Sequence, residues 1–306
     1  RLLGSGGALT LQSTLSYCPI FGGESVRDHD PTNLKGGVIT LGHEIRKLFL
    51  ASDNESFNRL YEFVGHREIN QRMQSLGLRS TVINHRLSVG RSADENRHTP
   101  RIDIAAAPGL VTVPERESQL IIRNATIPGL AVGTGFMAGD KLKPEPMDFT
   151  TRNGIAVTDL QDLLVMLARP DIDIGKGPLL LSPDHRRFVL DAMAEYPADS
   201  PNPKYERKDY PDDWGKFFLP GLMRVCPRGE LRVVNKIGQA YGFTIDNAYI
   251  ENTRTGRSFF LTAVIYTNAD GILNDDTYEY ESAAFPFMSS LAEAVARALW
   301  RPDSGG

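Results

Sequence analysis

Ser52-Asp53-Asn54 is a run of three polar residues that interrupts the apolar stretch "LFLASDNESFNRLYEFVG". Such a run could belong to an active site, because hydroxyl and amide side chains move protons and bind substrates. It also has a purely structural interpretation. Ser52, followed three residues later by Glu55, fits a capping box that starts a helix. Apolar residues follow at helical spacing, namely Phe57, Leu60, Tyr61 and Val64.

Lys236-Ile237-Gly238 is the second candidate, and it lies at the end of the apolar run "LRVVNKIG". Acyl transfer to a serine needs a proton relay, a cationic anchor for a substrate carboxylate and oxyanion donors. A lysine can be the anchor, and a glycine lets a ligand approach a strand closely. The ordinary alternative is an exposed lysine at a strand end, because lysines are usually solvated.

The elements that would position these residues differ between the two halves of the chain. Residues 1–40 are rich in Gly, Pro, Ser and Asp and predict loops around short ordered pieces. Residues 79–100 predict a long polar loop, and residues 101–150 a β excursion or an insertion. Apolar periodicity predicts helices at 40–51, 52–65, 67–77, 158–170 and 182–196, with Thr158 as a plausible N-cap and Ser182 before Pro183 at a helix start.

The end of the chain changes character. "LRVVNKIG", "GFTIDNAYIEN" and "RSFFLTAVIYTN" predict three strands, and "TRTG" predicts a hairpin turn between the last two. An amphipathic helix, "FPFMSSLAEAVARALW", closes the pattern. We therefore expect an α+β fold without βαβ alternation. The expected layout is a single domain over 1–306, with loops in 1–40, a mainly helical 41–215 and a sheet with a C-terminal helix in 216–306.

Composition excludes several function classes. The 306 residues carry a formal net charge of −4, which gives no electrostatic reason to expect nucleic acid as a partner. No apolar run is long enough to span a membrane. The histidines show no close metal-ligand spacing, so neither a metal nor a cofactor is expected. Cys18 and Cys226 could pair, but two distant thiols are more often simply buried.

The ordered set of motifs resembles the serine β-lactamase and penicillin-binding protein family, and class A β-lactamases most closely. That family carries S-x-x-K, then S-D-N, then K-T-G. The sequence matches S-D-N in full and K-T-G as K-I-G, with Ile237 in place of threonine. The resemblance extends over roughly residues 40–100 and 150–300. It implies that Asp53 serves structure by binding backbone at the helix start.

The resemblance also implies roles for the other motif residues. Ser52 would relay a proton to the leaving nitrogen. Asn54 would hydrogen-bond the substrate's amide side chain and help hold the lysine of S-x-x-K. Lys236 would pair with the substrate carboxylate and tune the Ser52 hydroxyl. Gly238 would let the strand edge come close to the ligand, and the Gln239 backbone N–H would supply half of an oxyanion hole.

The sequence departs from the family pattern in three places. No serine has a lysine three residues later, so the S-x-x-K nucleophile, with the family's first helix and first strands, is expected upstream of the first residue. The family's deacylating glutamate has Arg91 at its expected position, and Glu95 is the nearby acid that could substitute. The span from Ser52 to Lys236 is longer than usual, with the surplus expected near 101–150 and 197–214.

These observations predict a β-lactamase-like serine hydrolase that cleaves a β-lactam or related amide through an acyl-enzyme. The expected partner is a small-molecule or peptide amide substrate. Two alternatives stay open: a penicillin-binding peptidase or transpeptidase with slow deacylation, and a non-catalytic relative that binds cell-wall peptides or a protein. The resemblance implies a periplasmic or secreted protein. The sequence does not determine the oligomeric state.

Overall fold

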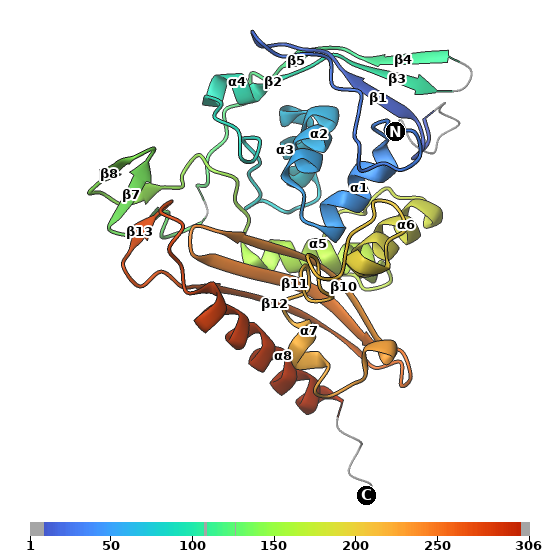
Figure 1. Cartoon of the computed structure of the whole chain (residues 1–306), viewed down its shortest axis with the longest axis vertical. Helices are drawn as coiled ribbons and strands as arrows, with labels where there is room; N and C mark the ends of the chain where they lie inside the picture. The colour runs from blue at the N-terminus through green and yellow to red at the C-terminus, as the bar shows by residue number, and fades with distance from the viewer. Residues whose placement is uncertain (1–8, 107–108, 126, 301–306) are drawn as a thin grey trace, which may run out of the picture.

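The computed structural model describes residues 9–106, 109–125 and 127–300 (Figure 1). Its C-terminal part is an antiparallel sheet in the order β10-β11-β12. The strands are β10 (Leu231–Ala240), β11 (Phe243–Asn252) and β12 (Ser258–Tyr266). The three predicted strands are therefore confirmed, and the "TRTG" sequence connects the last two. Residues 1–8 and 301–306 of the expected domain lie outside the described residues.

Helices cover both faces of this sheet (Figure 1). Successive side chains of a strand point to opposite faces, so the neighbours Val233 and Val234 enter two different apolar clusters. One cluster includes Met288 of α8 (Phe285–Leu299), and the other includes Leu164 of α5 (Val157–Ala168). Full burial of each such side chain contributes about 1.5–3 kcal/mol, so strands that are apolar on both faces hold two helical layers.

Two further helices tie these layers to the rest of the chain. On one face, α7 (Leu219–Leu222) packs so closely on α8 that a Cβ at Gly221 would lie 1.8 Å from the Ser289 carbonyl oxygen. On the other face, α6 (Pro183–Ala194) packs against β10 and α1. Ser182 caps α6, with Pro183 in its first turn, as the sequence predicts. Thr158 is not the N-cap of α5, because Ala156 occupies that position.

The N-terminal part combines helices with a second sheet. The helices are α1 (Leu41–Leu50), α2 (Asn54–Val64) and α3 (His66–Ser75), close to the predicted bounds. The sheet has the order β1-β3-β4, formed by β1 (Thr14–Tyr17), β3 (Ile102–Ala106) and β4 (Gly109–Val113). Leu15, Ile39 and Ile104 are buried in its core, and Leu60 of α2 packs against it.

The segment between these parts is only partly as predicted. The β-structure expected near 101–150 is confirmed, because strands β3 to β9 lie there. The remaining strands are β2 (His98–Thr99), β5 (Arg116–Glu117), β6 (Ala131–Val132), β7 (Gly135–Ala138), β8 (Lys141–Lys143) and β9 (Met147–Asp148). The predicted loop over 79–100 is wrong in its last part, which forms α4 (Ala93–Arg97) and β2.

A short parallel pairing joins the inserted strands to the C-terminal part. β13 (Ile272–Leu273) lies beside β7, so residues far apart in sequence meet at the left of Figure 1. Cys18 and Cys226 are both free thiols, and they do not pair. Among the described residues, no helix is long and apolar enough to cross a membrane.

Candidate active site

The turn between α1 and α2 carries the Ser52-Asp53-Asn54 motif. Asp53, not Ser52, is the N-cap of α2, and its carboxylate accepts a hydrogen bond of 2.7 Å from the Ser56 amide. The predicted capping box of Ser52 and Glu55 is therefore wrong. Ser52 adopts a φ of 54°, in the left-handed region that non-glycine residues seldom occupy. Such a backbone persists only where its surroundings hold it.

Buried ion pairs lie beneath this turn. Lys47 of α1 donates to Asp30 at 2.8 Å and lies 3.7 Å from the Asp53 carboxylate. Arg59 of α2 reaches Asp30 at 3.1 Å and Glu44 at 3.2 Å. Burial alone would raise the pKa of Asp30, but hydrogen bonds from Lys47 and Thr32 hold it well below its usual range. Asp30 thus keeps its charge beneath the α1–α2 turn, whereas burial raises the pKa of Glu44 despite its contact with Arg59.

Lys236 brings the second motif to the first. Its Nζ lies 2.6 Å from the Ser52 Oγ, although 184 residues separate the two. The same amine donates to the Ile237 carbonyl oxygen at 2.6 Å. The register of β10 and β11 pairs Lys236 with Asn247, well inside the ladder, so the lysine stands on a rigid strand. The structure therefore brings together the two predicted catalytic residues.

Burial changes the acid–base properties of this lysine. Desolvation lowers the pKa of Lys236 to about 8, and the charge of Asp246 opposes the shift. A side chain with that pKa exists in both protonation states near neutral pH. It can therefore pair with an anion as the ammonium or take a proton from a hydroxyl as the amine. Ser52 is the hydroxyl in contact with it.

Asp246 belongs to a second buried polar group, which lies behind the motif strand. Its Oδ1 accepts from the Asn235 amide at 2.8 Å, and Lys216 Nζ donates to Asn235 Oδ1 at 2.8 Å. Lys216 also donates to the backbone carbonyls of Met193 and Val233, both at 2.8 Å. Burial raises the pKa of Asp246 to about 7 and lowers the pKa of Lys216 to about 7.

A cavity of about 830 Å³ opens over the Ser52–Lys236 contact, and we call it the Ser52 cleft. Four of the other predicted residues have clear places in or beside it. Asn54 lines it and donates to Ser88 Oγ at 2.9 Å. Gly238 and Gln239 line it from β10. A Cβ at Gly238 would lie 2.9 Å from Ile245 Cγ2, so glycine suits this position. Asp53 is also at the cleft and caps α2.

The cleft is also lined by residues that the sequence analysis did not predict. Its further lining residues come from separate segments of the chain and include Phe57, Arg152, Tyr241, Tyr278 and Tyr280. Tyr241 has a φ of 54° and precedes Gly242 at the tight turn between β10 and β11. The Tyr-Gly pair is the local sequence feature that could have indicated this turn, because a two-residue hairpin turn needs residues with left-handed backbone conformation.

A second cavity, of about 540 Å³, borders the same motif residues from another side. Ser52, Asn54 and Gln239 line both cavities. The remainder of the second lining is largely apolar and includes Trp214, Phe217 and Phe285. The motif residues thus have open space on two sides.

Glu95 does not line either of these cavities. Its carboxylate accepts from the Ser92 amide at 2.8 Å, and the Ser92 hydroxyl accepts from the Glu95 amide, which together form a capping box on α4. Arg91 pairs with Glu95 at 3.3 Å. This geometry gives no support to the expected role of Glu95 in activating a water for deacylation.

Comparison with known proteins decides the family. A family described as "Beta-lactamase enzyme family" matches residues 7–298. The chain belongs to this family. It is thus a β-lactamase-like protein of the group that also holds the penicillin-binding proteins, as the two motifs predicted. No curated protein matches the chain.

The solved structures similar to this β-lactamase family member are distant. A β-lactamase from Streptosporangium roseum has 12% identity and a TM-score of 0.44, with 89% of this chain and 71% of that chain covered. A β-lactamase from Sphaerobacter thermophilus has 16% identity and a TM-score of 0.45, with 91% and 72% covered. An acyl-enzyme complex of a PBP-A mutant with penicillin G has 16% identity and a TM-score of 0.45, with 95% and 74% covered.

Proposed function

We propose that the Ser52 cleft is an acyl-transfer site for a β-lactam or a related amide, which reacts through an acyl-enzyme. The contact of 2.6 Å between Lys236 Nζ and Ser52 Oγ carries this proposal. A lysine with a pKa near 8 beside a serine hydroxyl is suited to move a proton at neutral pH. Family membership supports the same class of chemistry.

Each motif residue has a place in this reaction. Lys236 binds the substrate carboxylate and tunes the hydroxyl of Ser52, which passes a proton to the leaving nitrogen. Asn54 hydrogen-bonds the substrate's amide side chain from the cleft wall. Gly238 keeps the edge of β10 accessible, and the backbone N–H of Gln239 supplies half of the oxyanion hole. Among the residues that the structure describes, β10 pairs with β11 alone, so its other edge can receive a ligand.

The nucleophile is proposed to be the serine of an S-x-x-K motif that the 306 residues do not contain. The largely apolar cavity of about 540 Å³ borders both Ser52 and Asn54. A nucleophile placed there would lie next to the hydroxyl that is to relay its proton.

A second candidate function is a penicillin-binding peptidase or transpeptidase whose acyl-enzyme turns over slowly. The capping role of Glu95 favours it, because a carboxylate bound to a helix start is not placed to activate water in the cleft. A non-catalytic relative that binds cell-wall peptides is the remaining alternative.

The test uses the natural full-length protein and a fluorescent penicillin. Acyl transfer predicts a covalent adduct, and peptide mapping by mass spectrometry locates it. Nitrocefin turnover then separates hydrolysis from a persistent adduct. Lys236→Ala should abolish labelling, and Lys208→Ala, which changes an exposed lysine outside the cleft, should not.

Three outcomes would count against parts of the proposal. No adduct and no turnover with the full-length protein would favour the binding relative. An adduct on Ser52 itself would make Ser52 the nucleophile instead of a proton relay. Equal labelling of Lys236→Ala and the parent protein would remove Lys236 from the chemistry.

A further inference from the structure

Three tyrosines line the Ser52 cleft in addition to the motif residues, and the proposed acyl transfer gives none of them a role. Tyr241 follows the end of β10, and Tyr278 and Tyr280 lie in the segment between β13 and α8. All three residues are half-buried. We call them the tyrosine wall.

Contacts connect the three tyrosines. The ring centroids of Tyr278 and Tyr280 lie 5.1 Å apart, with a tilt of 39° between the rings. Tyr280 Oη accepts a hydrogen bond of 2.9 Å from the amide of Gly242, the residue after Tyr241. Tyr278 Oη accepts one of 2.6 Å from the Asn274 amide. Because the hydroxyl end of each of these two rings is bound to backbone, the rings have fixed orientations.

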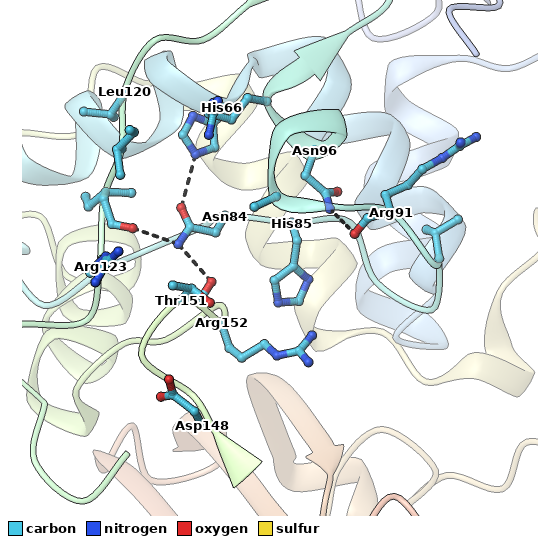
Figure 2. A pocket seen from close by; sticks show the side chains of 15 residues that line it. His66, Asn84, His85, Arg91, Asn96, Leu120, Arg123, Asp148, Thr151 and Arg152 are labelled. Carbon is cyan, nitrogen blue, oxygen red and sulfur yellow. Dashed lines mark hydrogen bonds between the residues drawn. The ribbon is translucent and has the colours of Figure 1, made fainter. Parts of the chain in front are cut away.

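The segment around β9 supports the wall beside Tyr241. The ring of Phe149, directly after β9, meets the Tyr241 ring edge to face, with 5.4 Å between the centroids. The Phe149 carbonyl accepts a hydrogen bond of 2.9 Å from Asn124 Nδ2. Two residues further, the Thr151 carbonyl accepts one of 3.0 Å from Asn84 Nδ2, as Figure 2 shows. Phe149 therefore stands on anchored backbone and holds Tyr241 in turn.

Strand β7 supports the wall on the side of Tyr278 and Tyr280. β13, which precedes both tyrosines, pairs with β7 in parallel. Asn274, whose amide binds Tyr278, also donates from Nδ2 to the Met137 carbonyl of β7 at 2.9 Å. The wall is thus preorganised, and a preorganised wall loses little conformational freedom when a ligand binds.

Backbone strain is concentrated at the cleft. Among the described residues, the non-glycine residues with a positive φ all line it, and they are Ser52, Ser88, Tyr241, Asn274 and Asp276. Residues with a side chain seldom adopt such conformations, and those that do cluster at ligand sites. Tyr241, Asn274 and Asp276 belong to the wall or to the segment that carries it. The strain therefore marks this wall as well as the motif turn.

The order of residues along β10 places the wall relative to the proposed reaction. Lys236 is the proposed anchor for the substrate carboxylate, and the Gln239 amide is the proposed oxyanion donor. Tyr241 lies beyond Gln239 on the side away from Lys236, at about 7 Å along an extended strand. In a β-lactam the carboxylate lies on the leaving-nitrogen side of the reacting carbonyl, and the acyl side chain lies on the other. A substrate bound by both groups therefore directs its acyl side chain toward the tyrosine wall.

We infer that the tyrosine wall binds an aromatic ring carried by the acyl side chain of the substrate. Aromatic rings pack on one another in edge-to-face or offset arrangements, which strengthen binding beyond the burial of apolar surface. Tyrosine supplies such contact area at a small cost in side-chain freedom. The inference rests on the proposed function, because the direction of the acyl side chain follows from the roles of Lys236 and Gln239.

Two amides that do not acylate the protein test the wall: N-phenylacetylglycine and N-cyclohexylacetylglycine. Both carry an amide and a carboxylate, and they differ only in the ring. The cyclohexyl ring buries at least as much apolar surface, so burial alone predicts no preference for phenyl. Aromatic packing predicts that the phenyl compound binds about threefold to tenfold more tightly. Titration of the natural full-length protein, followed by ligand-observed NMR, measures the ratio of the two dissociation constants.

Variants of the wall separate the ring from the bulk of the side chain. Tyr278→Leu and Tyr280→Leu keep an apolar side chain but remove a ring, so each should lower the phenyl preference at least about twofold. Tyr278→Phe keeps the ring and should keep the preference. The matched control is Tyr210→Ala, which removes one ring of the tilted Tyr205–Tyr210 pair outside the cleft lining. It should leave the preference unchanged. Circular dichroism and the melting temperature check that each variant is folded.

The inference is overturned if the two compounds bind the parent protein equally, or if neither binds at tens of millimolar. It is also overturned if Tyr210→Ala lowers the preference as much as Tyr278→Leu does. The fluorescent penicillin tests acyl transfer separately. A covalent adduct without a phenyl preference would refute the wall alone. A phenyl preference without an adduct would refute acyl transfer and leave the wall as a binding site.

Discussion

Two groups of buried charges flank the Ser52–Lys236 contact, and they are stabilised in different ways. Beneath Ser52, Asp30 is in direct contact with the cations of Lys47 and Arg59. Behind Lys236, the amide of Asn235 stands between Lys216 and Asp246. We call them the ion-pair cluster and the amide-bridged cluster.

The difference shows in their pKa values. Direct contact keeps the pKa of Asp30 well below its usual range despite burial, so its charge is retained. In the amide-bridged cluster burial prevails, and it raises the pKa of Asp246 and lowers that of Lys216, both to about 7. At Asp30 the hydrogen bonds from Lys47 and Thr32 outweigh burial, whereas at Asp246 the amide of Asn235 does not. Glu44 of the ion-pair cluster also has a raised pKa, because its burial outweighs the contact with Arg59.

The largest expected effect comes from breaking the ion-pair cluster. Arg59→Met leaves Glu44, which is fully buried, without its cationic partner. We expect the free energy of unfolding to fall by about 3–5 kcal/mol, because an uncompensated buried charge is costly. Urea denaturation measures the change. Arg67→Met, at an exposed pair with Glu68, is the control and should change stability by less than about 1 kcal/mol. Equal losses would contradict the contrast between buried and exposed pairs.

A smaller loss is expected in the amide-bridged cluster. Lys216→Met removes a side chain whose three hydrogen-bond acceptors are neutral oxygens. The three acceptor oxygens are left unsatisfied, but no carboxylate loses a cation in direct contact with it. We expect a loss of about 1–3 kcal/mol. A loss as large as that of Arg59→Met would show that Lys216 is a fully charged partner of Asp246.

The pH dependence of stability separates the clusters further. An acid whose pKa is raised on folding, such as Asp246, adds stability that is present at low pH and lost as pH rises through about 7. Asp30 has a lowered pKa in the folded protein. The stability that it adds is lost as the pH falls below the pKa that Asp30 has in the unfolded chain. Asp246→Asn should therefore remove a decline in stability between about pH 4 and pH 7. Thermal unfolding across this range measures it, and an unchanged profile would contradict the raised pKa.

The smallest effect is expected at the rim of the cleft. Ser88→Ala removes the hydrogen bond that Asn54 donates at an exposed position. We expect stability to change by less than about 1 kcal/mol, because water can replace the hydroxyl. If Asn54 binds substrate, KM should change more than kcat. A loss of several kcal/mol would show that this contact supports the α1–α2 turn.

The sequence determined most of the framework by itself. Strands such as "LRVVNKIG" and helices such as α1 follow from local apolar periodicity, which does not depend on distant residues. The helix start at Ser182-Pro183 is a local rule of the same kind. The ordered motifs were enough to predict the family and the pairing of Ser52 with Lys236.

Only the tertiary structure decided the properties of the site. Asp53 caps α2 from a turn in which Ser52 has a φ of 54°, and buried ion pairs from other segments lie beneath that turn. The lowered pKa of Lys236 comes from burial. Periodicity is a property of neighbouring residues, whereas desolvation and charge pairing are properties of residues brought together by folding.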